Sequence, residues 1–392
     1  MLCNRRELRG QEVDQKLQVD IAERLFALKD NKQTDLADTV YKQPALDYFS
    51  QEVSEREEAL FFRQYPLLIC LSCEMPKPGD YHCDDFSGVP IIVVRRKEGS
   101  VAAYLNVCRH RGARLACDNG SGLRQLRCPY HSWRYAADSG NLVSIPFDEG
   151  FAELDKIEFG LHQLPVVEHG GLIFVKPTQG DSIDPSGFLA GFESDLISYE
   201  IENYHHFETR VLEAKVNWKL VIDTFLETYH LNSLHRETVA PILHNNLSVF
   251  TAQGNHLRMV AARKTLDELK DIPEHKWDLI QHSAIIYVLF PNTVFIMQGD
   301  HLETWRVYPG ESPNESRMHV SLYTPEASTT ESASQYWSKN MDLLMATVLQ
   351  EDFPLATNIQ KDFPSRGGDM VFGRNEPALQ HFHRRLKAKL GS

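Results

Sequence analysis

The chain has 392 residues and a formal net charge of −13, with 42 % hydrophobic and 24 % charged residues. This composition is typical of a globular protein and excludes general disorder, and the length favours at least two domains. An acidic chain repels nucleic acid and anionic membrane surfaces, so we expect neither as a partner. The sequence shows no apolar run of membrane-spanning length and no secretory leader, and its 7 cysteines favour a reducing cytoplasm.

The pattern of the chain changes near residue 49. Residues 1–48 are polar and carry apolar residues at helical spacing, which predicts an N-terminal helical segment packed against the C-terminal domain. Residues 49–177 contain short runs rich in Val, Ile and Leu between turns such as KPGD and KEGS, which predicts a β-rich domain. A stretch rich in Pro, Gly and Asp follows and is typical of a linker.

Residues 178–392 combine helical and strand patterns and predict a second domain. Residues 216–235 repeat apolar side chains at three- and four-residue spacing, which predicts one helix with Asn217 as its N-cap. Four runs between residues 284 and 324 predict consecutive antiparallel strands, and a helix is expected over about 331–350 before a basic C-terminal helix. The expected fold class is therefore α+β, with an antiparallel sheet in the second domain.

Four potential metal ligands lie on two short loops of the β-rich domain. Cys108 and His110 form C-R-H, and Cys128 and His131 form C-P-Y-H, so each loop offers one thiolate and one imidazole. A Rieske [2Fe–2S] centre needs two cysteines on one iron and two histidines on the other. A zinc site is the alternative, but zinc fingers usually pair like residues at C-x₂₋₄-C and H-x₃₋₅-H spacing. The mixed loops therefore favour the iron–sulfur cluster.

A second group of potential ligands lies in the predicted helix at 216–235. Asp223, Glu227 and His230 are spaced i, i+4 and i+7 and are expected to share one face, and His235 follows five residues later. Two histidines and one carboxylate on one side of an iron leave positions open for O₂ and substrate, as in non-haem Fe(II) oxygenases. Taken alone, this spacing favours ordinary histidines over a metal site, since the chain has 17.

Around both groups the sequence closely resembles the Rieske non-haem iron oxygenases. NVCRHRGARLA (106–116) and CPYHSWRY (128–135) are similar to the two cluster loops of that family, except that Ser132 stands where the usual second loop has glycine. NWK followed by DTFLETYHLNSLH is similar to the iron-binding segment of the terminal oxygenase α subunit of the aromatic ring-hydroxylating dioxygenase family. The resemblance implies a Rieske domain and a helix-grip type catalytic domain with a mononuclear iron.

The resemblance also implies roles for individual residues. The [2Fe–2S] cluster is expected on the four loop residues named above. The mononuclear Fe(II) is expected on His230, on His235 and on a carboxylate that follows a long helix near the C-terminus. Asp352 is the predicted third ligand, and Glu351 and Asp362 are near enough in the sequence to compete with it.

In this family the α subunits form head-to-tail homotrimers, in which a carboxylate bridges a cluster histidine of one chain to an iron-ligand histidine of the next. The resemblance implies that Glu227 holds that position with His131 as its partner, and Asp223 is the second predicted catalytic carboxylate. It further implies a separate reductase, with or without a ferredoxin, which relays electrons from NAD(P)H. The chain itself carries no strand-linked G-x-G-x-x-G and no plant-type ferredoxin motif.

The substrate is the least determined feature of the sequence. Members of the family hydroxylate aromatic rings, which is the first expectation for this chain. Others remove N- or O-methyl groups or attack small quaternary ammonium compounds, and Glu227 in place of the more usual aspartate favours that alternative. A soluble Rieske electron carrier without oxygenase activity is the alternative from another class, although such carriers need little beyond the cluster domain.

Overall fold

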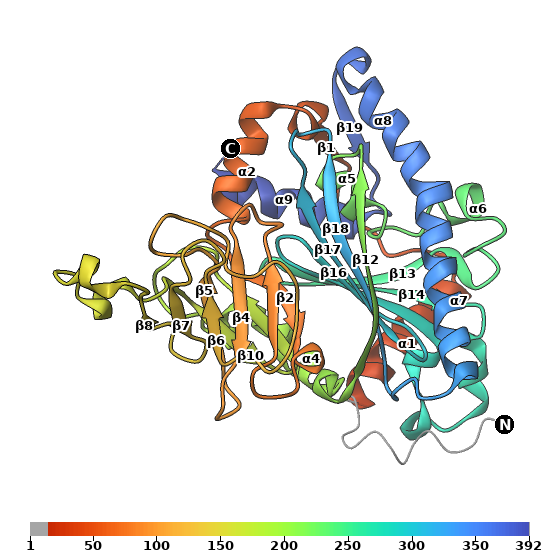
Figure 1. The fold of residues 1–392 in the computed structure, drawn as a ribbon. Coiled ribbons are helices and arrows are strands. Elements are labelled where there is room, and N and C mark those ends of the chain that lie inside the picture. The colour runs from red at the N-terminus through yellow and green to blue at the C-terminus, as the bar shows by residue number, and fades with distance from the viewer. Residues whose placement is uncertain (1–14, 392) are drawn as a thin grey trace. The chain divides into compact units, whose positions relative to one another are not determined.

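The computed structural model describes residues 15–391 (Figure 1), and its contacts divide the chain into two compact units. The larger unit contains the residues up to Glu57, Leu189–Glu200 and the residues from Tyr204 onward. The smaller unit contains Glu58–Phe188 and Ile201–Asn203. This division is based on contacts within the chain, and the domain boundaries expected from the sequence at residues 48 and 177 stay predictions.

The smaller unit is built from three antiparallel sheets, as its short apolar runs predict. The first has the strand order β10-β11-β2, the second β3-β4-β5-β9 and the third β6-β7-β8. The strands are β2 (Leu67–Leu71), β3 (Tyr81–Asp84), β4 (Ile91–Arg95), β5 (Val101–Leu105), β6 (Gln125–Arg127), β7 (Arg134–Ala136), β8 (Leu142–Ser144), β9 (Gln163–Leu164), β10 (Val166–His169) and β11 (Leu172–Val175). The helix α3 (Pro185–Leu189) follows them in the chain.

One hydrophobic cluster of the smaller unit supports the two predicted cluster loops. It contains the buried side chains of β4 and β5, together with Trp133 and Tyr135 and with the two cysteines of the loops, Cys108 and Cys128. Each of these four side chains is at most 2 % exposed. The loops are therefore held from beneath by packed apolar side chains, and such packing resists rearrangement.

The larger unit is centred on a seven-stranded antiparallel sheet with the order β12-β18-β17-β16-β15-β14-β13. Its strands are β12 (His205–Ala214), β13 (Leu243–Gln253), β14 (His256–Arg263), β15 (Ser283–Leu289), β16 (Thr293–Met297), β17 (Leu302–Pro309) and β18 (Ser316–Thr324). The four consecutive strands predicted between 284 and 324 are confirmed. The sequence reading missed β12, β13 and β14, of which β12 is polar and largely half-buried.

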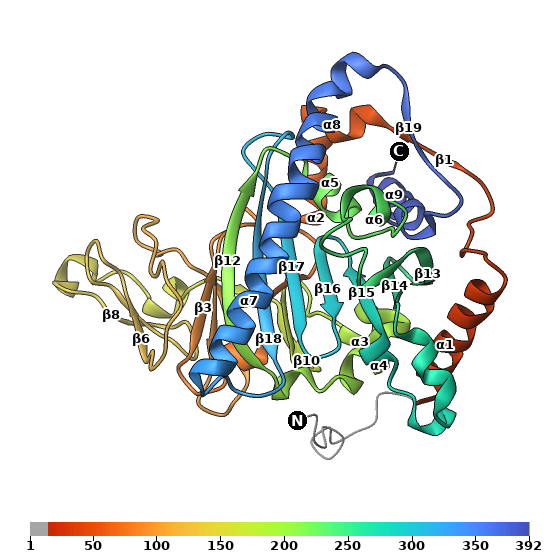
Figure 2. The ribbon, with the colours of Figure 1, turned by 90° about the vertical axis from the view of Figure 1, so that its right-hand side faces the viewer.

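Helices and one small ribbon complete the larger unit. The helices are α1 (Gln15–Asp30), α2 (Gln51–Phe61), which ends in the smaller unit, α4 (Glu193–Ser198), α5 (Trp218–Asp223), α6 (Leu231–Leu234), α7 (Glu331–Thr347), α8 (Phe353–Arg366) and α9 (Pro377–Leu390). A two-stranded ribbon pairs β1 (Tyr41–Pro44) with β19 (Asp369–Phe372). Figure 2 shows α7 running along one face of the sheet. Among residues 15–391, no helix combines the length and the apolar character that crossing a membrane requires.

The N-terminal helical segment forms only in part. The helix α1 buries Ile21 and Leu25, as the spacing predicts, and it packs against β13. The prediction for residues 1–14 lies outside the described residues. The expectation that helix continues to residue 48 is wrong, because the chain leaves the helix after Asp30 and forms β1 at Tyr41.

The single helix predicted over 216–235 is wrong. Asn217 does cap α5 by accepting the N–H of Lys219 at 2.9 Å, but α5 ends at Asp223 and the chain becomes helical again only at α6. The Glu227 carboxylate accepts the backbone N–H groups of Tyr229 and His230, which replaces the helical hydrogen bonds there. The expected common face of Asp223, Glu227 and His230 therefore does not exist.

The helix predicted over 331–350 is longer than expected and contains an irregular turn. After α7 the chain forms a π-helical turn over Val348–Asp352 and continues directly into α8. A π turn inserts an extra residue and so changes which side chains face the sheet, and such turns are frequent at functional sites. This turn contains both Glu351 and Asp352.

Candidate metal centres

The two predicted cluster loops, which begin at Cys108 and Cys128, have the same pattern of backbone hydrogen bonds. The cysteine N–H of each loop donates to a carbonyl five residues later at 2.8 Å, and the N–H four residues later donates back to the cysteine carbonyl at 3.0 Å. In the first loop this fourth position is Gly112 with φ of 78°, and in the second it is Ser132 with φ of 61°. The left-handed conformation explains why glycine is usual there, and Ser132 adopts it while its hydroxyl accepts a hydrogen bond from Arg127 at 2.9 Å.

The four predicted cluster residues form two like pairs in space, although each loop mixes them in sequence. The ring centroids of His110 and His131 are 4.6 Å apart. The Nδ1 atoms of both rings are buried and have no hydrogen-bond partner among the residues that the structure describes. The Cys108 thiol has Cys128 as a neighbour, and burial above all raises its pKa. Two adjacent thiols and two adjacent imidazoles with unoccupied Nδ1 atoms are the donor set that a Rieske cluster requires.

Aromatic side chains surround this group and hold the donors in place. The Trp133 ring stacks on His110 with an interplanar angle of 5°, and the Tyr130 ring lies 3.8 Å from that of His131. The Tyr135 hydroxyl is 3.2 Å from the Cys108 sulfur and accepts the N–H of Arg109 at 3.0 Å. Burial, followed by the charges of neighbouring basic groups, lowers the pKa of His110, which favours the neutral imidazole. Sequence reasoning missed Tyr135, whose only local signal is its place soon after the loop.

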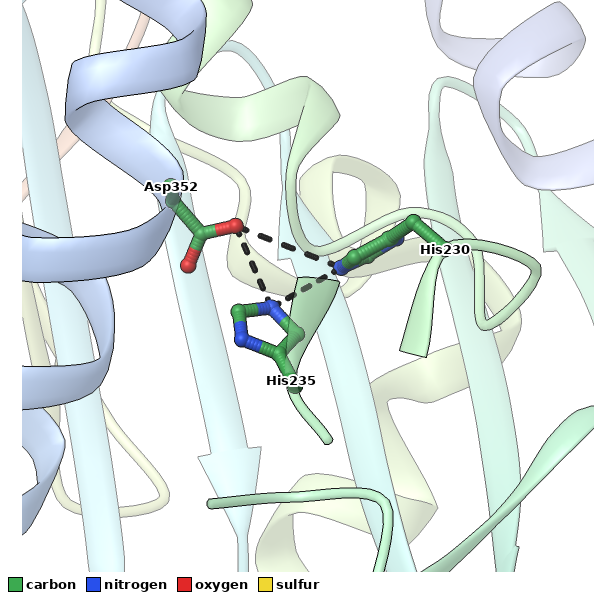
Figure 3. Close-up of side chains that lie close together, drawn as sticks. All are labelled: His230, His235 and Asp352. Atoms are coloured by element: carbon green, nitrogen blue, oxygen red, sulfur yellow. Dashed lines mark hydrogen bonds and ion pairs between the residues drawn. The ribbon is translucent and has the colours of Figure 1, made fainter. Parts of the chain in front are cut away.

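In the larger unit, His230, His235 and Asp352 come together as predicted (Figure 3). One ligand atom from each lies within 4.8 Å of the other two. The two Nε2 atoms are 3.1 Å apart, and the Asp352 Oδ1 atom is 3.2 Å from His235 Nε2 and 4.0 Å from His230 Nε2. The histidines lie at the two ends of α6 and the carboxylate comes from the π turn after α7, so the donors converge from two segments. Two imidazoles and one carboxylate suit a non-haem Fe(II).

A second carboxylate stands behind each histidine. The Nδ1 atom of His230 contacts Glu227 Oε1, and Nδ1 of His235 is 2.6 Å from Glu351 Oε2. Glu351 also accepts the Thr238 hydroxyl at 2.7 Å. Such contacts fix the tautomer and direction of an imidazole, so both Nε2 atoms face the same point. Burial alone would lower the pKa of His235, but the hydrogen bonds to Asp352 and Glu351 raise it overall.

The structure separates the competing carboxylates. Glu351 contacts the outer nitrogen of His235, and Asp362 is exposed on α8, so neither reaches the point where the two Nε2 atoms meet. Asp223 is part of a different buried network, in which it accepts the Tyr48 hydroxyl and faces His383 Nε2, each at 2.7 Å. Of these carboxylates, Asp352 alone lies close to both Nε2 atoms, and its role as third ligand stays a prediction. The predicted catalytic role of Asp223 also stays a prediction, and Asp223 lies in a separate network.

Two family models match separate parts of the chain. The model for the Rieske [2Fe-2S] domain matches residues 66–158. The model for the ring hydroxylating alpha subunit (catalytic domain) matches residues 201–392. The first range contains both cluster loops, and the second contains the triad.

Individual relatives match about half of the chain. The glycine betaine monooxygenase oxygenase subunit of Pseudomonas aeruginosa is 34 % identical over 207 residues, which are 53 % of this chain and 47 % of the relative. The biphenyl 2,3-dioxygenase subunit alpha of Rhodococcus jostii is 38 % identical over 218 residues, which are 54 % of this chain and 44 % of the relative. The chain thus spans about half the length of the curated relatives it matches.

Solved structures share the fold over nearly the whole chain. A quaternary ammonium Rieske monooxygenase in complex with L-carnitine superimposes with a TM-score of 0.77 and 20 % sequence identity, covering 95 % of this chain and 99 % of the other. At this identity the similarity shows the fold alone, a β-rich Rieske unit and a catalytic unit with an antiparallel sheet.

Proposed function

The chain belongs to the Rieske non-haem iron oxygenases, and from this premise we propose that it is the terminal oxygenase component of a multicomponent system. It uses O₂ and electrons relayed from NAD(P)H by a separate reductase, with or without a ferredoxin, to oxidise a small organic substrate. Monooxygenation and dioxygenation both take up two electrons and two protons for each O₂. The observation that carries the proposal is the presence of two complete donor sets in one chain, one for each metal centre.

Each donor set fits the group that the family carries. Cys108, His110, Cys128 and His131 would hold the Rieske cluster, and the two buried, unpartnered Nδ1 atoms are the atoms that would bind its second iron. The triad would hold the mononuclear iron, with open positions for O₂ and substrate. When bound, the cluster supplies single electrons and the mononuclear iron activates O₂.

The residues around the triad position its donors and limit their freedom. Glu227 and Glu351 orient the two imidazoles through their Nδ1 atoms. His235 and Asp352 are buried to 3 % and 7 % exposure, so the site keeps bulk water away from two of its three donors. Low local polarity strengthens each charge interaction there.

We propose that the active form is a homotrimer in which Glu227 accepts hydrogen bonds from His230 of its own chain and from His131 of the neighbouring subunit. The contact between Glu227 and His230 within one chain supports the first half of this arrangement. A carboxylate between two imidazoles would fix both rings and stabilise positive charge on either. A head-to-tail trimer repeats that contact three times.

For the substrate we propose a small compound with a methylated or quaternary nitrogen. The support is the similarity to glycine betaine and carnitine monooxygenase oxygenase subunits at 34 % and 28 % identity, together with glutamate at position 227. An aromatic ring is the second candidate, because the biphenyl 2,3-dioxygenase subunit alpha is 38 % identical over a similar length.

The test is turnover of the reconstituted holoenzyme. With NADH and a surrogate reductase, a panel of methylated amines and aromatic compounds is assayed for NADH and O₂ consumption and for product mass. We expect a product that contains oxygen from O₂ or has lost a methyl group, and no product from Asp352→Ala, which retains the cluster spectrum. A protein that takes up electrons into its cluster but binds no mononuclear iron would instead be an electron carrier.

A further inference from the structure

One strand of the large sheet places a carboxylate between two apolar side chains of the neighbouring strands. Glu303 lies in β17, and the residues directly opposite it in β16 and β18 are Ile296 and Leu322. Directly opposite residues of paired strands point to the same side of a sheet. Glu303 is 3 % exposed, and its buried Oε2 atom has no hydrogen-bond partner among residues 15–391. A buried carboxylate with an unpaired oxygen is unfavourable unless something complements it.

A second unpaired polar atom lies two residues along the same strand. Trp305 is on the same side of the sheet as Glu303 and is fully buried, and no acceptor in the described part of the chain faces its Nε1 atom. Its ring lies 5.1 Å from that of Phe225, which precedes Glu227 by two residues. This contact places Trp305 beside the segment that carries the two histidines of the triad.

Two basic groups, His301 and Arg263, lie near Glu303, but neither hydrogen-bonds to its Oε2 atom. His301 contacts Glu303 Oε1 through Nε2 at 3.0 Å and Asp300 Oδ1 through Nδ1 at 2.8 Å. Although burial lowers the pKa of His301, these two carboxylates raise it to about 9. The His301 imidazolium is therefore shared between the carboxylates of Asp300 and Glu303. The Arg263 guanidinium attracts Glu303 and Asp300 electrostatically, but its hydrogen bonds go to the Gln298 amide oxygen and to the Ser283 carbonyl.

We propose that Glu303 and Trp305 form the recognition site for a cationic nitrogen group of the substrate, in a compound that also carries an acceptor oxygen. The Glu303 carboxylate supplies the opposite charge, and the Trp305 ring offers a face that attracts cations. The indole N–H is then free to donate to the acceptor oxygen of the same compound. This inference rests on the proposed oxygenase function and selects between its two substrate classes, because a neutral aromatic hydrocarbon offers no charge to Glu303.

The test compares a cation with its neutral isostere. Binding of glycine betaine, choline and L-carnitine to the iron-loaded holoenzyme is measured by calorimetry without O₂, beside 3,3-dimethylbutanoate, in which carbon replaces the ammonium nitrogen of glycine betaine. We expect the wild type to bind glycine betaine at least roughly 10-fold more tightly than 3,3-dimethylbutanoate. Glu303→Gln, which keeps the side-chain shape, is expected to bring the two affinities within roughly threefold.

A matched control comes from the same strand. Thr304 also has a buried, unpartnered hydroxyl but points to the opposite side of the sheet, so Thr304→Val is expected to retain the cation preference. If Glu303→Gln does not fold, judged by its circular dichroism and cluster spectrum, Trp305→Leu replaces it and should reduce the preference roughly 5- to 30-fold.

Three outcomes would overturn the inference: equal wild-type affinity for glycine betaine and its isostere, no binding of any of the three cations, or a preference that both variants retain. Each leaves the proposed function intact if the holoenzyme still oxygenates an aromatic compound. That function fails separately if the protein does not hold mononuclear iron.

Discussion

Replacing Glu351 by glutamine tests whether the tertiary contact behind His235 contributes to iron binding. The Glu351 carboxylate accepts hydrogen bonds from the His235 imidazole and from the Thr238 hydroxyl, at 2.6 and 2.7 Å. Glutamine keeps the length of the side chain and one acceptor oxygen but removes the negative charge. The variant should therefore fold and keep its cluster, while the His235 ring loses part of its orientation and basicity.

The magnitude follows from the kind of bond that is lost. Hydrogen bonds to a charged partner contribute about 1.5 to 3 kcal/mol, and those between neutral groups contribute about 0.5 to 1.5 kcal/mol. Replacing the carboxylate by an amide therefore weakens each of the two hydrogen bonds to residue 351 by about 1 to 1.5 kcal/mol. The Glu351 side chain is 22 % exposed, so solvent screens part of its charge. We expect a net loss of about 1.4 to 2 kcal/mol, which is roughly a 10- to 30-fold weaker affinity for Fe(II).

The assay is competition for Fe(II) with a chelator of known affinity, followed by iron analysis of the protein with its cluster spectrum as an internal standard. Thr238→Val removes one hydrogen bond to Glu351 but leaves the contact between Glu351 and His235, so it should weaken binding by a smaller factor. Asp362→Asn changes an exposed carboxylate on α8 and should have no effect. A dissociation constant for Glu351→Gln within about twofold of the wild type would refute the reasoning.

Four further predictions follow from the two sites. Alanine at any of the four cluster-loop residues should abolish the visible Rieske spectrum while mononuclear iron stays at its wild-type content, because each residue is one of only four protein bonds to the cluster. Asp352→Ala should deplete mononuclear iron and abolish turnover with the cluster spectrum unchanged; full activity would exclude Asp352 as third ligand. Ser132→Gly relieves a left-handed conformation that costs about 1 to 2 kcal/mol, against about 0.5 to 1 kcal/mol of added chain entropy. It also removes the hydrogen bond from Arg127, which is exposed to solvent and contributes little. A thermal melt at the cluster absorbance should therefore show about 0.5 to 1 kcal/mol more stability, and a lower melting temperature would contradict this. Glu227→Gln should retain the cluster, and mononuclear iron when Fe(II) is in excess, and lose turnover. Mixed oligomers of a His131 variant with an Asp352 variant should recover part of the activity if Glu227 acts across subunits.

Features that depend on residues close together in the chain can be predicted from the sequence. In each cluster loop, the cysteine, the histidine and the turn residue lie within a few positions of one another. Their spacing therefore predicts the kind of metal site without knowledge of the fold. The strands from 284 to 324 were equally evident, because consecutive apolar runs separated by short turns pair with one another in order. Asn217 was identifiable as an N-cap for the same reason: its hydrogen bond spans two residues.

The tertiary structure decided what depends on distant residues or on competition between hydrogen bonds. The helix expected over 216–235 breaks because the Glu227 carboxylate takes over backbone N–H groups, which helical periodicity does not reveal. The sequence leaves Glu351 as a competing iron ligand. In the structure it instead contacts the Nδ1 atom of His235, a residue 116 positions away in the chain. The sequence around Glu303 gives no sign of its special environment. Only the register of β16, β17 and β18 shows that Glu303 lies between apolar neighbours. Sequence determines which donors exist, but the direction of each side chain is set by packing between segments far apart in the chain.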